Sequence, residues 1–432
     1  MSILIKNGRI ICPGQNIDKV MDIYVKNGVI SELGKDISME AETVIDASNM
    51  WVTPGLIDLH VHLRDPGLTH KEDMQSGSKA AAMGGFTTIC AMPNTKPAMD
   101  TPELVRETGE RMKKDSAIDI LVIGAATTGQ KGEVLADIEG MAKAGVCAIS
   151  EDGFSVLDSK LVKEAFKKCA ENNLPMFSHC EDLALVNGGV INEGVASEKF
   201  GLLGISNDSE DVIVARDIIL AAATGAKLHL CHMSTRGSVD IIRGAKALGA
   251  NVSAEVCPHH FTLCDEDIVE NDGDYKMNPP LRSRADMNAI IEALKDNTIE
   301  IIATDHAPHH VDEKTGGFEK AANGIVGLET ALALGITELV KKNILTPSEF
   351  IGKLTCNPAK VLGIKAGLLK VGYPADIAVI DAETEYAVNI DEFRSKGKNT
   401  PFNGKKVCGK AIYVVKNGNI VADNGKINEK PS

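Results

Sequence analysis

The sequence has no apolar run long enough to cross a membrane and no excess of basic side chains. None of its apolar runs reaches the roughly 18 to 20 residues that a transmembrane helix needs. Its 46 lysines and arginines are outnumbered by 60 aspartates and glutamates, which gives a net charge of −14. Because proteins that bind nucleic acid concentrate positive charge, this balance argues against a nucleic-acid partner.

Paired cysteines and a secretion signal are also missing. The ten cysteines are scattered singly, without a Cys-x-x-Cys pair, which is typical of free thiols in a reducing compartment. The first residues, Met-Ser-Ile-Leu-Ile-Lys-Asn-Gly, lack the basic, apolar and small-residue order of a signal peptide and alternate like a β-strand. We therefore expect a cytoplasmic protein.

Three similar segments of the form Lys-Asn-Gly-x-Ile stand near the two ends of the chain. They cover residues 6–10, 26–30 and 416–420. Asn-Gly between β-rich runs favours tight hairpin turns. The simplest arrangement is a small β-sandwich domain built from both termini, with halves at residues 1–53 and 367–432.

The middle of the chain, residues 54–366, alternates between short apolar runs and helix-like stretches. Helical spacing is clearest at residues 74–83, 160–172, 238–248 and 284–295. The strand candidates are residues 57–63, 87–92, 119–125, 146–150, 175–179, 227–232, 251–256 and 299–304. Eight β-then-α units predict an α/β fold of the (β/α)8 TIM-barrel type, with a doubly wound open sheet as the alternative.

Histidines and aspartates recur where the predicted strands end, which is where barrels of this type carry their chemistry. His60 and His62 share one strand face because they are two residues apart. The full set of candidate metal ligands is His60, His62, Asp152, His179, His232 and Asp305. Imidazole and carboxylate ligands suit zinc, or cobalt or manganese. Six ligands exceed the need of one tetrahedral ion, so two metals with a bridging group are the economical interpretation.

Other histidines fit the metal site less well. His229 lies three residues before His232 and is expected on the opposite strand face, in core or helix packing. His259 and His260 follow the seventh strand, where a structural role and a role beside the site are equally compatible with the sequence.

Two stretches, residues 58–67 (Asp-Leu-His-Val-His-Leu-Arg-Asp-Pro-Gly) and 303–309 (Ala-Thr-Asp-His-Ala-Pro-His), together resemble the signatures of dihydroorotases. The similarity extends to Met-Pro-Asn-Thr at 92–95 and Cys-Pro-His-His-Phe at 257–261. The resemblance implies two Zn²⁺ ions per chain. One would be held by His60, His62 and Asp305, and the other by His179 and His232.

The bridging ligand departs from the commoner family pattern. Many relatives carry a carboxylated lysine on the fourth strand, but no lysine lies within residues 146–153. Some bacterial members that resemble this chain use an aspartate there, which corresponds to Asp152.

The resemblance also implies the substrate contacts and the reaction. Arg64, Asn94 and His309 match positions that hold the substrate carboxylate, and Asn278 matches a contact to the ring amides. The implied reaction is the reversible cyclisation of N-carbamoyl-L-aspartate to L-dihydroorotate plus water in pyrimidine biosynthesis. A metal-bridged hydroxide would be the nucleophile, with Asp305 as general acid and base.

Several alternatives stay open at this level. The chain is also compatible with a hydantoinase or allantoinase type of cyclic amidohydrolase, or with an inactive structural partner of aspartate carbamoyltransferase. Family precedent suggests a homodimer, and the sequence leaves open whether it associates with that carbamoyltransferase. Residues 307–323 form a polar loop that either closes over the substrate or is a mobile surface connection.

Overall fold

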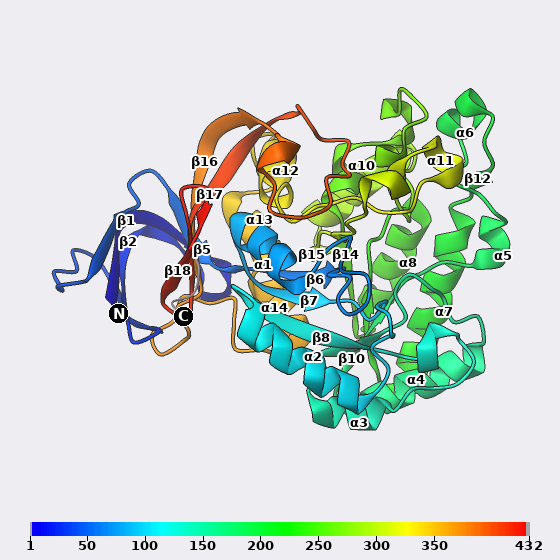
Figure 1. Ribbon diagram of the computed structural model, residues 1–432, viewed down its shortest axis with the longest axis horizontal. Helices are drawn as coiled ribbons and strands as arrows, with labels where there is room; N and C mark the ends of the chain where they lie inside the picture. Colours follow the sequence, from blue (N-terminus) through cyan, green and yellow to red (C-terminus); the bar gives the residue numbers. More distant parts are fainter. Residues whose placement is uncertain (1, 429–432) are drawn as a thin grey trace.

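The computed structural model describes residues 2–428, and the first and last strands of this range lie in the same small sheet. In Figure 1 the small sheet stands to the left of a larger barrel. The order of the small sheet is β19-β18-β17-β16-β5-β1-β2-β3, with β4 paired to β1. Its strands are β1 (Ser2–Cys12), β2 (Ile17–Lys26), β3 (Val29–Gly34), β4 (Thr43–Asp46), β5 (Trp51–Pro54), β16 (Ile377–Ala387), β17 (Lys406–Lys416), β18 (Asn419–Asp423) and β19 (Lys426–Ile427).

The small β domain is thus built from both ends of the chain, as the repeated segments predict. Hydrogen bonds join its nine strands into one continuous sheet, and strands from both ends share one apolar core. Two of the three Asn-Gly pairs, at Asn27 and Asn417, form hairpin turns with positive φ. The prediction of a turn is wrong for Asn7, which lies inside β1 at a bulge against β2.

The barrel prediction is confirmed, and the open-sheet alternative is excluded. Eight parallel strands follow in spatial order from β6 to β15, and the gap between these two is bridged by Val61 and His306. The backbone N–H of His62 donates to the carbonyl of His306 over 2.8 Å. The barrel strands are β6 (Leu56–Val61), β7 (Phe86–Ala91), β8 (Asp119–Ala125), β9 (Ala148–Ser150), β10 (Pro175–Ser178), β13 (Lys227–Leu230), β14 (Val252–Val256) and β15 (Ile301–Ile302).

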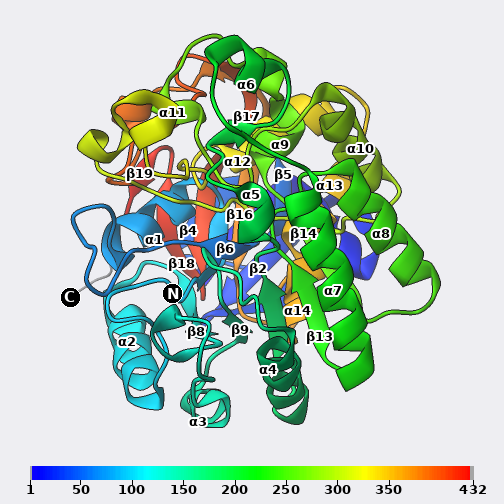
Figure 2. The same cartoon turned by 90° about the vertical axis from the view of Figure 1, so that its right-hand side faces the viewer.

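Helices surround these strands, as Figure 2 shows for α2, α4, α7 and α8. The four helices expected from spacing are present within two residues, as α1 (Met74–Met83), α4 (Ser159–Glu171), α8 (Arg236–Ala247) and α10 (Arg284–Lys295). Each begins after a side chain that accepts backbone N–H groups, namely Asp73, Asp158, Thr235 and Ser283. The remaining larger helices are α2 (Pro102–Asp115), α3 (Ile138–Ala144), α7 (Asp208–Thr224), α13 (Pro347–Leu354) and α14 (Cys356–Leu362). No helix in residues 2–428 is long and apolar enough to cross a membrane.

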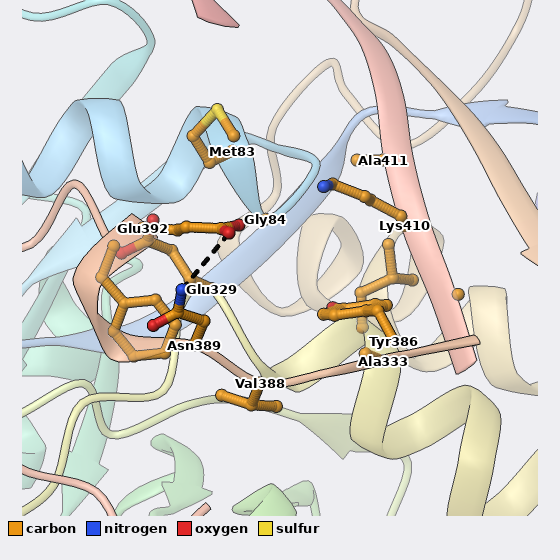
Figure 3. A pocket seen from close by; sticks show the side chains of 13 residues that line it. Met83, Gly84, Glu329, Ala333, Tyr386, Val388, Asn389, Glu392, Lys410 and Ala411 are labelled. Carbon is orange, nitrogen blue, oxygen red and sulfur yellow. Dashed lines mark hydrogen bonds between the residues drawn. The ribbon is translucent and has the colours of Figure 1, made fainter. Parts of the chain in front are cut away.

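The connection between β16 and β17 leaves the small sheet and packs against the barrel. The carboxylate of Glu329, beside the barrel helix α12 (Ala331–Gly335), accepts the backbone N–H groups of Arg394 and Ser395. Figure 3 shows the small cavity of about 70 Å³ beside this contact, lined by Glu329, Tyr386 and Asn389 among others. Further along, Asn399 reaches the barrel loops, so residues 388–405 connect the C-terminal segment to the barrel mouth.

Candidate active site

The predicted site residues meet in one cavity at the carboxyl ends of the barrel strands. The cavity measures about 150 Å³. Among the residues that line it are nine predicted ones: His62, Arg64, Asn94, Asp152, His179, Asn278, His232, Asp305 and His309. The tenth, His60, is fully buried and lies against two of them, because its Nε2 is 3.3 Å from Asp152 Oδ1 and 3.5 Å from Asp305 Oδ1.

Asp152 lies at the centre of the candidate metal ligands. Its carboxylate oxygens are 3.3 Å from Nε2 of His60 and of His62, and 3.5 Å from Nδ1 of His179 and Nε2 of His232. Ligands about 2 Å from a shared ion are separated by roughly such distances. One carboxylate in contact with four imidazoles has the placement that a bridge between two ions needs.

Asp305 approaches the same group from the last strand. Its Oδ1 is 3.0 Å from Nε2 of His62, and the ligand atoms of His60, His62 and Asp305 lie within 4.8 Å of one another. The ligand atoms of His60, Asp152 and His232 form a second such triad. The two triads share His60, so the candidate ligands form one continuous donor set.

Unpartnered polar atoms provide a test of whether these residues fit a cation. Nε2 of His60 and Oδ1 of Asp152 are fully buried and have no hydrogen-bond partner within residues 2–428. Burying such atoms without a partner costs roughly 1–3 kcal/mol each. A divalent ion satisfies lone pairs of both kinds, so the donor set fits a metal centre.

The charges of the site favour a cation as well. Burial by itself would raise the pKa of Asp152, but the surrounding histidine rings outweigh burial and hold that pKa well below its ordinary value. Burial lowers the pKa of His179, yet Asp152 and Glu181 outweigh it and raise that pKa to about 10. Both shifts show that the buried carboxylates are stabilised by nearby positive charge. A bound metal ion supplies that charge and leaves the imidazoles neutral, which is the form that binds metals.

A buried carboxylate that the sequence did not predict contacts His60 on the side of the ring away from the other candidate ligands. Glu255 on β14 is fully buried, and its Oε1 is 2.8 Å from Nδ1 of His60. Its Oε2 is 2.8 Å from Nε2 of His229, whose Nδ1 is 2.8 Å from Ser253 Oγ. Metal-binding histidines commonly have such carboxylate partners. The signal that could have identified Glu255 is an acidic residue within the buried strand Val-Ser-Ala-Glu-Val.

The expected orientation of His229 is wrong. The residue is buried as predicted, but its ring faces Glu255 beneath the metal ligands rather than the opposite face of the strand. Strand alternation fails here because β13 ends at Leu230, and His232 has a left-handed backbone with φ 39°. Asp305 (φ 47°) and Arg64 (φ 59°) share this conformation, which costs a non-glycine residue on the order of 1 kcal/mol. Such outliers are typical of functional sites.

His179 and Asn278 are joined by a second missed carboxylate. Glu181 Oε2 is 3.4 Å from Nε2 of His179, and its Oε1 accepts the amide N–H of Asn278 over 2.9 Å. Asn94, on another loop, places its amide oxygen 2.8 Å from Nδ1 of His62. Both asparagines therefore line the pocket and also contact a candidate metal ligand, directly in the case of Asn94 and through Glu181 in the case of Asn278.

Arg64 brings a positive charge into the pocket lining beside His309, and the neighbouring Lys71 is paired with Glu313 over 2.7 Å. Arg64 Nη2 is 3.3 Å from Nε2 of His309, and Lys71, which the sequence analysis missed, places Nζ 3.4 Å from Nδ1 of the same ring. Burial, together with Arg64 and Lys71, lowers the pKa of His309 to about 3. A buried guanidinium beside a neutral imidazole is suited to binding a carboxylate.

His259 and His260 are buried and do not line the cavity. His260 Nε2 is 3.0 Å from the carbonyl of Pro279, the residue after Asn278. This contact places His260 in support of the segment that carries Asn278.

Comparison with known proteins places the chain among cyclic amidohydrolases. Residues 50–238 match the family model described as "Dihydro-orotase-like". A protein of Acetivibrio thermocellus named "Dihydroorotase" is 48% identical over 418 residues, covering 97% of this chain and 98% of the relative. Proteins of the same name from Geobacter metallireducens and Clostridioides difficile are each 48% identical and cover 98% and 97% of this chain and 99% of their own lengths.

Solved structures give the same architecture. The L-hydantoinase of Arthrobacter aurescens superposes with a TM-score of 0.91 at 27% identity, covering 99% of this chain and 97% of that one. A D-hydantoinase from Thermus sp. gives a TM-score of 0.86 at 24% identity and covers 99% and 97%. The second likeness concerns the fold alone.

Proposed function

Because this chain belongs to the dihydroorotase family, we propose that it catalyses the reversible cyclisation of N-carbamoyl-L-aspartate to L-dihydroorotate plus water. The single observation that carries the proposal is that buried Arg64 shares one cavity with five of the six candidate ligands, while the sixth, His60, lies directly against Asp152 and Asp305. A donor set alone fits many metal hydrolases, whereas Arg64 beside it fits a cyclic amide with a carboxylate substituent.

We infer that two zinc ions occupy the donor set. His60, His62 and Asp305 would hold one and His179 and His232 the other, with Asp152 between them. Bound zinc would supply a nucleophilic water of lowered pKa and polarise the amide carbonyl. The contacts of Asp152 with four histidine rings support its assignment as the bridge.

The chain's own residues would orient the substrate and move the proton. Arg64, Asn94 and His309 would hold the substrate carboxylate, and Asn278 would contact the ring amides. In ring opening, Asp305 would take a proton from the attacking water and deliver it to the departing ring nitrogen. In ring closure the same carboxylate would take the proton from the carbamoyl nitrogen.

The experiment that tests this function pairs metal analysis with absorbance-monitored hydrolysis of dihydroorotate. We expect turnover with close to two zinc ions per chain. Two metals without turnover would contradict the assigned substrate. Absence of both metal and turnover would contradict the enzyme assignment and favour the inactive partner of aspartate carbamoyltransferase, although all six ligand positions are filled here.

A hydantoinase activity is the second candidate, favoured by the 0.91 TM-score with an L-hydantoinase. Simple hydantoins lack the carboxylate that we assign to Arg64 and His309. We therefore expect hydantoin and allantoin to be poor substrates in the same assay. A cytoplasmic homodimer, alone or with aspartate carbamoyltransferase, remains our prediction for the assembly, to be measured by analytical ultracentrifugation.

A further inference from the structure

Lys314 is a buried lysine whose ammonium is surrounded by backbone carbonyls. It ends the short helix η5 (Val311–Lys314) in the loop after β15, and the residue is only 7% exposed. Its Nζ donates to the carbonyl oxygens of Lys276 at 3.0 Å, Ala322 at 2.8 Å and Gly324 at 2.8 Å. All three N–H groups of the ammonium are therefore used.

Such an arrangement is unusual for a lysine. Lysine is rarely buried unless it is paired, because removing an ammonium from water costs free energy. Burial lowers the pKa of Lys314 to about 8, with Asp274 acting in the opposite direction. Three charge-assisted hydrogen bonds offset part of this cost, and they do so only while all three carbonyls stay in place.

The three carbonyls belong to two separate segments that line the candidate active site. Lys276 lies two residues before Asn278, which lines the pocket. Ala322 and Gly324 flank Asn323, which lines the same pocket together with Gly324. One ammonium therefore connects the segment after β14 with the end of the loop after β15.

A second side chain holds the same loop from the C-terminal segment. Asn399 accepts the backbone N–H of His309 over 3.0 Å, and its amide group donates to the carbonyls of Ala307 and Gly324. The start of the loop is thus held by Asn399, while its end at Gly324 is shared by Asn399 and Lys314. Apart from Lys314, the Gly324 N–H donates to the Lys276 carbonyl over 3.0 Å, and farther from the pocket the Phe318 N–H donates to Asn271 Oδ1 over 2.7 Å.

We propose that Lys314 is a positioning residue for substrate binding, which clamps the segment of Asn278 to the segment of Asn323 across the pocket. The inference rests on the proposed function, since the clamp affects turnover only if this pocket binds the substrate. It assigns Lys314 no contact with the reacting atoms. Its effect is therefore on KM and not on kcat.

The charge state of the ammonium gives the clamp a pH dependence. Asp272 and Asp274 favour the charged form, whereas burial and Lys276 oppose it. Loss of the proton above about pH 8 leaves two donors for three carbonyls. We expect KM of the wild-type enzyme to rise above that pH.

The test compares zinc-loaded K314M and K314A with the wild type and with K320M, an exposed lysine of the same loop. We expect both Lys314 variants to raise KM roughly tenfold, the scale of one lost charge-assisted hydrogen bond, with kcat and zinc content close to wild type. Propylammonium replaces the missing part of the side chain in K314A and should lower its KM again. K314M should lose the rise of KM above pH 8, and K320M should keep it.

Hydrogen–deuterium exchange provides a readout independent of activity. Amides of residues 276–278 and 322–324 should exchange faster in K314M than in wild type or K320M. Unchanged KM and exchange, a loss confined to kcat, or failure of propylammonium to act on folded K314A would overturn the clamp. If K314A does not fold, K314M and the wild-type pH profile decide. A wild-type enzyme without dihydroorotate turnover would instead overturn the proposed function, and the exchange data would still test the clamp.

Discussion

Glu255 and His60 are joined by a hydrogen bond of 2.8 Å between Oε1 and Nδ1, and neither side chain is exposed to solvent. Burial would raise the pKa of Glu255, but His229 and His60 outweigh burial and lower that pKa to about 2. Glu255 is therefore a carboxylate that can only accept a hydrogen bond, so Nδ1 of His60 must carry the proton that is donated to it. The other nitrogen, Nε2, is then free to bind a metal. Glu255 thus sets both the tautomer and the orientation of the His60 ring, although Glu255 is not itself one of the candidate ligands.

Substituting Glu255 with glutamine should weaken zinc binding without removing any ligand. The amide keeps the shape of the side chain but loses the charge that orients His60, and loss of such outer partners costs roughly 10–100-fold in metal affinity. Competition with a chromophoric chelator measures the change. E292Q, on the exposed face of α10, is the matched control. Equal zinc affinity in E255Q and E292Q would contradict this role.

Replacing Asp152 with asparagine should disrupt the metal pair as a whole. The neutral amide offers one oxygen to four histidine rings, so it cannot join both ions as a carboxylate can. We expect zinc content to fall well below two per chain and turnover to fall by more than the roughly 100-fold typical of outer-partner losses. Metal analysis and dihydroorotate hydrolysis check both, with D240N on α8 as the control. Two tightly bound ions in D152N would rule out the bridging assignment.

Arg64 should control affinity for the substrate carboxylate. R64K keeps one positive charge but loses the planar fork, and R64M loses both. We expect KM for dihydroorotate to rise roughly 10–100-fold in R64M, the equivalent of one charged hydrogen bond, and less in R64K. Zinc content should stay unchanged, as in the exposed control R106M. Steady-state kinetics with an unchanged KM in R64M would place the substrate carboxylate elsewhere.

His309 should act as a neutral imidazole throughout the working pH range. Its pKa of about 3 results from burial and from the neighbouring Arg64 and Lys71. A lowered pKa of a base means that the ring is uncharged at every pH well above 3, so KM should show no transition near the ordinary histidine value of about 6.5. Measuring KM from pH 5 to 7.5 in wild type and H309N tests this. A transition near 6.5 that is present in wild type and absent in H309N would contradict it.

The convergence of the candidate ligands could be predicted from sequence because the barrel fold itself brings its strand ends together. Parallel strands in a closed barrel end at one mouth, so a histidine or aspartate at several strand ends must converge there. His60, Asp152 and Asp305 come from the ends of three different strands, yet Nε2 of His60 lies 3.3 Å from Asp152 Oδ1 and 3.5 Å from Asp305 Oδ1. Neither tertiary contacts nor precise strand limits were needed for this inference.

The supporting residues could not be predicted because their partners are remote in sequence. Glu255 is 195 residues from His60, and Asn399 is 90 residues from His309. Asn399 also belongs to a C-terminal segment that the repeat pattern assigns to the small β domain. His229 was misplaced for a local reason, since strand alternation does not continue through the left-handed backbone at His232.

Asp305 provides the sharpest test of the mechanism because it is assigned two roles. As a ligand it contributes an oxygen to the metal centre, and as a general acid and base it carries a proton. D305N keeps an oxygen but cannot take up a proton at pH 7, so at saturating zinc the two roles separate. We expect kcat to fall by roughly 10²–10⁴-fold, the scale of general acid–base catalysis, while zinc content and the circular dichroism spectrum stay near wild type. If the activity of D305N instead rises to the wild-type value as zinc is raised to saturation, Asp305 acts as a ligand only, and another group must carry the proton.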